Sequence, residues 1–469
     1  MSETTPQREN KMGTQSVNSL LISMALPMIA SMLVQALYNI VDSIFVSQLS
    51  ESALTAVGLA FPVQNLMIAV GVGTGVGVNA LLSKSLGERN QEQADRAADT
   101  GLFLAGASTL AFVLFGVFFT RLYFSSQNVP PDILQDGVDY TFIVTVFSIG
   151  LFGQTMLEKL LAATGRTVLS MVCQLVGALF NIVMDPILIF GLFGFPKMGV
   201  AGAAWATVLG QILGFLVGLW LHITRNKEVK VTLKGCLRPH GATVRRIYAV
   251  GLPSIAMNSV GSVMTFCMNQ VLLAFTSTAA AVFGVYFKLQ SFVFMPVFGL
   301  NNAMVPIISY NYGARKPDRL KRTITLSAVY AELFMAVGVL VFQLLPAQLL
   351  GLFNASPDML AIGVPSLRII SVSFLLAGVA VVGSSVFQAL GHGMLSLWVS
   401  IARQLLVLIP LAFLFSLSGR LEAVWWAFPC SELVSLALTL VFLRRVLRQV
   451  VAPLYCEAGR PPLEGPGAL

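Results

Sequence analysis

The sequence predicts an all-α integral membrane protein with twelve transmembrane helices in two parallel-repeat lobes of six. Three observations predict this fold. Of the 469 residues, 56% are hydrophobic and 11% are charged, whereas a soluble domain carries about 25% charged residues. Twelve mostly apolar runs are each long enough to cross a bilayer, which takes about 20 residues. The two halves of the chain also resemble each other. The composition excludes a soluble enzyme, a disordered chain and an extracellular disulfide scaffold.

The twelve predicted spans follow one another with turn residues and charges between them. In the N-terminal lobe (17–223) they lie at about 17–47, 53–82, 95–120, 139–163, 168–194 and 199–223. In the C-terminal lobe (245–445) they lie at about 245–275, 279–310, 322–348, 364–389, 394–416 and 422–443. We predict a cytoplasmic N-terminal segment at 1–16, a cytoplasmic linker at 224–244 and a cytoplasmic tail at 446–469.

The basic residues predict the orientation of the chain. Of the 29 Lys and Arg residues, 23 fall on the side that holds both termini, four fall on the other side, and Lys288 and Arg403 fall inside spans. Loops that stay in the cytoplasm carry the excess of Lys and Arg. We therefore expect a multi-pass protein of the cell (plasma or inner) membrane with both termini in the cytoplasm.

A shift of 226 residues aligns the two halves of the sequence. The aligned identities include Pro27 with Pro253, Gly73 with Gly299, Arg89 with Arg315 and Gly165 with Gly391. Because each repeat holds an even number of spans, both repeats have the same orientation, related by an axis along the membrane normal. Parallel halves around a central cleft are typical of alternating-access carriers.

Two acids inside the spans have polar neighbours at helical spacing. Asp42 follows Tyr38 by four residues, and Asp185 follows Asn181 by four, so each pair shares a helix face. Pro186 cannot donate a helix hydrogen bond, which frees a carbonyl oxygen beside Asp185. Carboxylates, an amide and a carbonyl suit a hard cation or a proton relay, since a desolvated carboxyl group can exchange a proton near neutral pH. Alternatively, both acids pair with interior donors and only hold helices together.

The other intramembrane charges have less polar surroundings. We interpret Glu332 and Glu432 as structural or interfacial, and Lys288 and Arg403 either as ion-pair partners or as contacts for substrate or gating. The glycine run at 71–77 is interpreted as a site of close helix packing. A predicted substrate cavity is lined by Asn39, Phe61, Gln64, Met264, Phe287, Lys288, Gln290 and Arg403.

The sequence favours no enzyme and no bound cofactor. The five cysteines and three histidines have no metal-type spacing, and no nucleophile motif is present. Nucleic-acid binding is not expected either, because the basic residues lie in separate short loops. The expected partners are small amphiphilic organic substrates and membrane lipid, and a monomer would suffice for function.

Several motifs resemble the multidrug and toxic compound extrusion (MATE) family over about residues 15–445. They are Ala25-Leu26-Pro27, Tyr38-Asn39 before Asp42, Asn181 with Asp185-Pro186, and the segment from Gly199 to Thr207. The resemblance implies a V-shaped bundle of two six-helix lobes. It also implies a cation-coupled antiporter that exports amphiphilic, often cationic, organic compounds against H+ or Na+.

The same resemblance implies a site for the coupling cation in the N-terminal lobe. That site, which could hold Na+, would be built by residues matching Asp42, Asn181, Asp185 and Thr207, with Tyr38 beside them. The family's other main branch places key acids in the seventh and tenth helices. Here the spans at 245–275 and 364–389 contain no Asp or Glu, which favours the DinF-like or MepA-like branch.

Two other functions stay open at this point. A flippase for lipid-linked saccharides has a related architecture, but its cavity should carry several cations to meet phosphate. Only Lys288 and Arg403 are available inside the spans. A membrane-bound enzyme or channel subunit is disfavoured by the missing catalytic motifs and by the two-lobe repeat.

Overall fold

The computed structural model describes residues 10–127, 130–353 and 355–457, and every regular element among them is a helix. Long helices are expected from the apolar runs, and their starts carry ordinary capping chemistry. The side chains of Asn90, Thr276 and Ser356 accept hydrogen bonds from the first turns of three long helices. Proline occupies an initial position in others, as at Pro131 and Pro317.

The first repeat contains α2 (Val17–Ser47), α3 (Glu51–Gly87), α4 (Gln91–Phe118), α6 (Pro131–Val146), α7 (Ile149–Ala163), α8 (Thr167–Phe190) and α9 (Val200–Arg225). The second contains α11 (Gly241–Leu273), α12 (Ser277–Gly313), α13 (Pro317–Leu344), α15 (Pro357–Ala389), α16 (Gly393–Ile401), α17 (Ile409–Ser416) and α19 (Ala427–Val446). Shorter helices are α1 (Lys11–Thr14), α5 (Thr120–Ser125), η1 (Leu192–Gly194), α10 (Leu233–Cys236), α14 (Pro346–Gly351), α18 (Leu421–Trp425) and α20 (Ala452–Glu457). Two π-helical segments are η2 (Ala402–Leu408) and η3 (Leu447–Val451).

The predicted spans agree closely with these helices. Eleven helices among the described residues are long and apolar enough to cross a membrane, and α6 with α7 makes a twelfth span that is bent by 45°. The fourth span, predicted as one helix over 139–163, is therefore broken at Phe147 and Ser148, and it begins earlier, at Pro131. Helical structure also continues beyond 446 to Glu457, so the predicted tail is partly helical. Residues 1–9 and 458–469 of the two predicted terminal segments lie outside the described residues.

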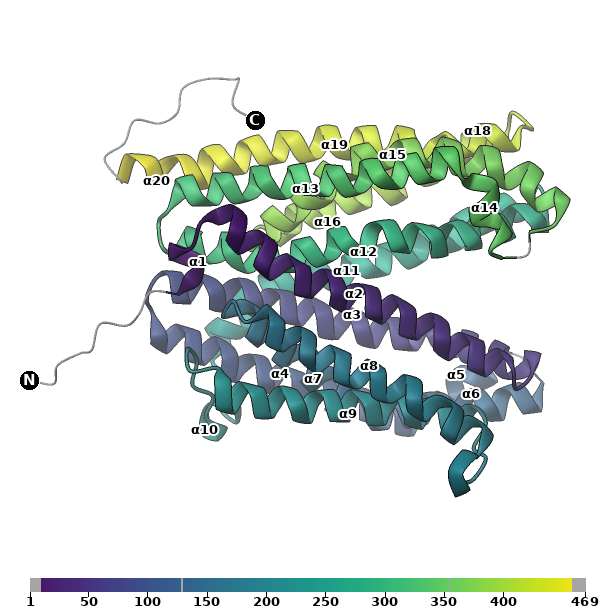
Figure 1. Ribbon diagram of the computed structural model, residues 1–469, viewed down its shortest axis with the longest axis horizontal. Coiled ribbons are helices and arrows are strands. Elements are labelled where there is room, and N and C mark those ends of the chain that lie inside the picture. Colours follow the sequence, from purple (N-terminus) through teal and green to yellow (C-terminus); the bar gives the residue numbers. More distant parts are fainter. Residues whose placement is uncertain (1–9, 128–129, 354, 458–469) are drawn as a thin grey trace, which may run out of the picture. The chain divides into compact units, whose positions relative to one another are not determined.

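Two compact units divide the chain. One unit holds Met1–Ile29, Leu86–Arg89 and Ala256–Leu469, and the other holds Ala30–Ser85 and Asn90–Ile255. Within each unit the long helices run along a common direction (Figure 1). The units differ from the lobes expected at 17–223 and 245–445, because the first parts of α2 and α11 each belong with helices of the other repeat. The lobe boundaries stay a sequence-based prediction.

Glycines explain why these two helix segments pack where they do. A Cβ atom on Gly73 of α3 would lie 2.5 Å from the side chain of Ile255 in α11. A Cβ atom on Gly299 of α12 would lie 2.6 Å from Cα of Ile29 in α2. Both contacts need a residue without a side chain. Their partners are related by the same shift of 226 residues.

Individual hydrogen bonds also repeat at this shift. The hydroxyl group of Ser83 donates to the carbonyl of Ala163 at 2.9 Å, and that of Ser309 donates to the carbonyl of Ala389 at 2.8 Å. Each serine lies in the last turns of its helix, α3 or α12, and each carbonyl belongs to the last residue of the partner helix, α7 or α15. The predicted internal repeat is therefore confirmed at the level of single contacts.

Side chains clamp the segment that precedes α2. Arg319 of α13 donates to the carbonyls of Met12 at 3.0 Å and Gln15 at 2.6 Å, and Lys316 donates to that of Gly13 at 2.9 Å. Asn311 also donates to the carbonyl of Met12, at 3.1 Å. The start of the chain is thus tied to the ends of α12 and α13.

A second clamp holds the linker that precedes α11. The carboxylate of Asp99 in α4 accepts hydrogen bonds from the backbone and hydroxyl of Thr232, at 2.9 and 3.1 Å. Asp95, one turn earlier, accepts from the backbone of Lys230 at 2.9 Å. The linker is therefore fixed to α4, although it contains little regular structure.

Candidate functional site

The site begins on α8, where the polar side chains Gln174, Asn181 and Asp185 recur at spacings of seven and four residues on one face. Asn181 is 3% exposed and Asp185 is fully buried. Pro186, which follows directly, removes one backbone donor from the helix. A carboxylate that is withdrawn from water in this way needs a proton, a cation or hydrogen-bond donors.

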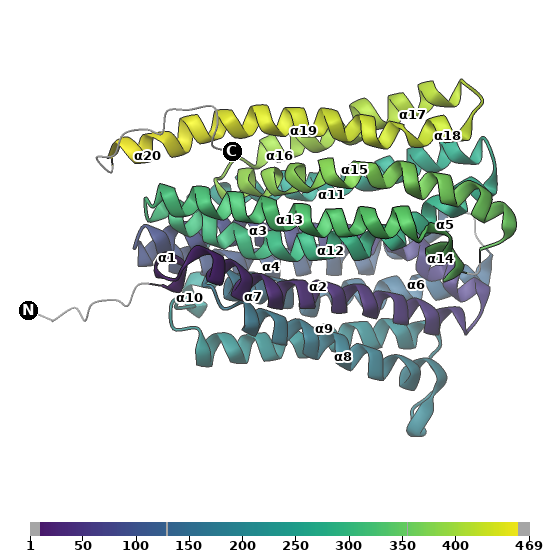
Figure 2. The same ribbon diagram turned by 45° about the horizontal axis from the view of Figure 1, so that its top comes forward.

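Helix α9 brings Thr207 to the same place. The two helices lie side by side (Figures 1 and 2), and glycine permits their close approach. A Cβ atom on Gly210 would lie 2.7 Å from the carbonyl oxygen of Gly177. With its amide nitrogen directed at Asp185, Asn181 donates to Asp185 Oδ2 at 3.3 Å. Its amide oxygen then accepts from the backbone and hydroxyl of Thr207, at 3.1 and 3.3 Å.

Helix α2 supplies the second carboxylate. Asp42 lies within hydrogen-bond reach of Asp185 when one of the two is protonated. One oxygen of each carboxylate, Oδ1, is buried and has no hydrogen-bond partner. Asp185 is fully buried and Asp42 is half-buried, and two carboxylates this close cannot both carry an unscreened charge. The arrangement therefore suits a shared proton or a small cation that oxygen atoms can ligate.

Two tyrosines border the carboxylates. Tyr38 of α2 and Tyr140 of α6 both interact electrostatically with Asp42 and Asp185. The hydroxyl of Tyr140 accepts a hydrogen bond of 2.9 Å from Gln64 of α3, so Gln64, predicted for the substrate cavity, joins this cluster. The sequence analysis did not single out Tyr140, because its hydrogen-bond partner lies 76 residues away on another helix.

A polar ladder next to the site holds α2 on α8. Gln174 donates to Gln35 at 3.0 Å and accepts a hydrogen bond from Ser31. On α2, Ser31, Gln35, Tyr38 and Asp42 recur at spacings of four, three and four residues, which places all of them on one face. This spacing along α2 was a usable signal for Ser31 and Gln35. Gln174 lies on α8, and its partners are on α2.

The remaining cavity residues of the first repeat lie elsewhere. Phe61 is 61% exposed, and Asn39 is exposed on α2. Neither has a described contact with the carboxylates. Their assignment to a substrate cavity stays a prediction.

In the second repeat, the charged residues have partners that the sequence left open. Arg403 and Glu432 form an ion pair with an Nη1 to Oε1 distance of 3.0 Å. Lys288 is exposed, and its ammonium lies 5.9 Å from the centre of the Phe353 ring. Glu332 accepts a hydrogen bond of 2.9 Å from the backbone of Val379. The interpretation of Glu332 as a residue that joins helices agrees with this contact.

The other predicted cavity residues of this repeat are Met264, Phe287 and Gln290. Met264 is 9% exposed, and Phe287 is half-buried against Tyr286, with ring centres 5.6 Å apart. Oε1 of Gln290 is buried and has no hydrogen-bond partner. Met264 lies in α11, Phe287 and Gln290 lie in α12, and Arg403 lies in η2. Their shared role in lining a substrate cavity stays a prediction.

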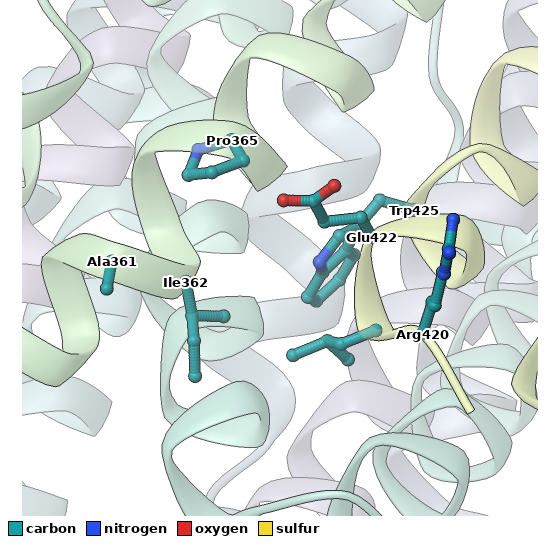
Figure 3. A pocket seen from close by; sticks show the side chains of 7 residues that line it. Ala361, Ile362, Pro365, Arg420, Glu422 and Trp425 are labelled. Carbon is teal, nitrogen blue, oxygen red and sulfur yellow. The ribbon is translucent and has the colours of Figure 1, made fainter.

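A surface pocket of about 380 Å³ opens at one end of this repeat, between α15 and α18. Figure 3 shows Arg420, Glu422 and Trp425 facing Ala361, Ile362 and Pro365 across it. None of the predicted site residues lines this pocket. Among the described residues, no three His, Cys, Asp or Glu side chains gather as a metal centre would require.

Comparison with known proteins bears on both repeats. The MatE family model matches twice, over residues 27–187 and 253–414, and the two matches begin 226 residues apart. The FAD transporter of Shewanella oneidensis is 24% identical over 427 residues, which cover 89% of this chain and 92% of that protein. The multidrug export protein MepA of Staphylococcus haemolyticus is 27% identical over 423 residues, covering 89% and 91%.

Solved structures show the same fold. One described as the outward-facing conformation of a multidrug resistance MATE family transporter of the MOP superfamily is 25% identical to this chain. It superposes with a TM-score of 0.89 and covers 95% of this chain and 99% of its own. The likeness extends over both repeats.

Proposed function

We propose that this chain, which belongs to the MatE family of membrane transporters and to its MepA-like branch, is a cation-coupled multidrug efflux antiporter. It exports amphiphilic, often cationic, organic compounds against H+ or Na+. The family match over both repeats and the similarity to multidrug export proteins support the export of drugs. The pair formed by the half-buried Asp42 and the fully buried Asp185 is the single observation that carries the coupling.

The carboxylate pair can couple cation entry to substrate export because binding of a cation changes the charge of the pair. When both carboxylates are ionised, each Oδ1 lacks a partner in a buried setting, and the loss of water makes that state costly. A proton shared between them relieves the cost, as would a sodium ion held by Asp42, Asp185, Asn181 and Thr207 with the amide of Asn181 rotated so that its oxygen faces the ion. A cationic substrate relieves it as well, so substrate and coupling ion compete for one charge site.

Competition of this kind gives exchange if the two occupants favour different conformations of the transporter. A ligand shifts a conformational equilibrium only by its differential affinity for the two states. One proton entering down a potential of 100 mV releases about 2.3 kcal/mol. That free energy supports a concentration gradient of roughly fifty-fold for a neutral substrate.

The fold and the basic loops also support a location and a topology. The protein resides in the cell membrane with both termini in the cytoplasm, and it requires no bound cofactor. A monomer suffices, because the coupling residues Asp42, Asn181, Asp185 and Thr207 lie within one chain. Its partners are the organic substrates and the surrounding lipid.

Efflux from vesicles tests the proposal. Purified protein in liposomes loaded with ethidium should export the dye when a pH gradient or a sodium gradient is imposed, each varied alone. The gradient that drives export identifies the coupling ion. Because one relative is named an FAD transporter, FAD belongs in the substrate panel. Export that ignores both gradients would contradict the coupling.

A further inference from the structure

An ion pair inside the second repeat has no role in the coupling described above. Arg403 is the second residue of the π-helical segment η2, and Glu432 lies in α19. Both charges lie inside apolar helical segments long enough to cross a membrane, Gly393–Ser416 and Leu421–Tyr455, where a charged side chain is costly and by default indicates function. Their Nη1 to Oε1 distance is 3.0 Å.

The pair is not a closed bridge. A guanidinium group has five N–H donors in a planar fork, and the described bond uses one nitrogen, Nη1. The Arg403 side chain is 27% exposed, whereas that of Glu432 is 13% exposed. Oε2 of Glu432 is buried and has no partner. Arg–carboxylate pairs are frequently bidentate, but in this pair the partly exposed Arg403 keeps further donors that a ligand can reach.

The helix around Arg403 is also unusual. Segments of π-helix are rare and frequently occur at functional sites. The side chain of Gln404 donates a hydrogen bond of 2.9 Å to Ser400, one turn earlier. This bond spans the helical turn that carries Arg403.

Aromatic side chains form a wall beside the pair. Tyr286 interacts electrostatically with both Glu432 and Arg403. Its ring centre lies 5.6 Å from that of Phe287 and 6.1 Å from that of Phe428. Phe283 joins these rings to Trp425, at 6.3 Å. Phe287 is only half-buried, so the wall offers an accessible aromatic face.

The geometry points to a substrate subsite: we propose that Arg403, held by Glu432, binds the carboxylate of zwitterionic aromatic compounds, whose rings stack on the half-buried Phe287. The proposal rests on the transport function above and names a substrate class for it. A guanidinium fork matches a carboxylate, and an aromatic face beside it adds stacking. A site for a plain organic cation is less suitable here, because Glu432 already holds a cation and is the less exposed partner.

Rhodamine B and its ethyl ester test the subsite, because they share one aromatic cation and differ in a single carboxylate. Fluorescence anisotropy of each dye with purified protein gives its Kd. The ratio of the two Kd values measures the preference for the carboxylate, which we attribute to Arg403. In Arg403→Gln the preference for rhodamine B should fall about tenfold. In Glu432→Gln it should rise several-fold, because the resident competing carboxylate is gone.

Two further variants guard against misfolding. The double variant Arg403→Gln/Glu432→Gln leaves no buried unpaired charge. Its preference for rhodamine B over the ester should be as weak as that of Arg403→Gln. Arg444→Gln, an exposed arginine on the same helix as Glu432, should keep the wild-type ratio. A role limited to holding η2 on α19 would move both single variants in the same direction.

An unchanged ratio in a folded double variant would overturn the subsite. So would a loss of affinity for the ester in Glu432→Gln that exceeds the change for rhodamine B, because Glu432 would then be a cation site. Equilibrium binding needs no ion gradient. If the Kd ratios are as expected but no gradient-driven efflux is seen, the result would therefore count against antiport and would still support the carboxylate subsite.

Discussion

Replacement of Gly210 by alanine tests how the packing of two helices builds the proposed cation site. A Cβ atom at this position would lie 2.7 Å from the carbonyl oxygen of Gly177 and 3.2 Å from Cβ of Asn181. Because backbone atoms cannot turn away, α9 must move off α8 by about 0.6 Å to restore an ordinary C···O separation of about 3.3 Å. The same movement would stretch the 3.3 Å contact between Asn181 and Thr207 to about 3.9 Å, which is too long for a hydrogen bond.

We expect Gly210→Ala to lower stability by about 1–3 kcal/mol, the usual cost of overpacking, and to weaken gradient-driven ethidium efflux at least tenfold. Thermal unfolding in detergent and vesicle efflux measure the two effects. Gly106→Ala is the matched control, since it lies in α4 with open space around its Cβ position. It should be neutral or slightly stabilising. A Gly210→Ala protein with the stability and the efflux of the wild type would refute the packing argument.

Two more predictions concern the clamps on the segments before α2 and α11. Arg319→Ala removes charge-assisted hydrogen bonds worth roughly 1.5–3 kcal/mol, so amide hydrogen exchange at residues 12–16 should become at least tenfold faster. Arg322 is exposed on the same helix, and Arg322→Ala should leave the exchange rate unchanged. Equal exchange rates in the two variants would contradict the clamp. Burial and the neighbouring Asp99 raise the pKa of Cys236 to about 11. Since a nearby negative charge disfavours the thiolate, Asp99→Asn should lower that pKa and shift the pH midpoint of Cys236 alkylation, followed by mass spectrometry, to lower pH. Asp95→Asn, whose carboxylate binds the backbone of Lys230 instead, should shift it less, and an unmoved midpoint in Asp99→Asn would contradict the electrostatic reasoning.

Much of the fold was predictable because apolar runs of bilayer length leave few alternatives to spanning helices. The repeat was predictable from matched glycines and prolines, such as Gly73 with Gly299. The bend between α6 and α7 was not, because the sequence around Phe147 and Ser148 has no proline. The packing of the first parts of α2 and α11 with helices of the opposite repeat was not predictable either, because it depends on contacts between residues more than 180 positions apart.

The candidate site was predictable where its residues share one helix. Asp42 with Tyr38, and Asp185 with Asn181, recur at four-residue spacing, and this pattern alone singled them out. Tyr140 and Gln174 escaped notice because their polar partners lie on other helices. Arg403 and Glu432 are 29 residues apart. The sequence allowed an ion pair for Arg403 as one of two interpretations, but spacing along one helix cannot identify a partner on another helix.

The most direct test of the coupling is ethidium efflux from liposomes under an imposed pH or sodium gradient, with Asp42→Asn and Asp185→Asn compared with the wild type. The exposed Asp132, in the first turn of α6, provides Asp132→Asn as the matched control. We predict that the wild type and the control respond to the driving gradient, whereas each of the two site variants exports ethidium no faster with the gradient than without it. Undiminished gradient-driven efflux in either site variant would contradict the assignment of coupling to this pair of carboxylates.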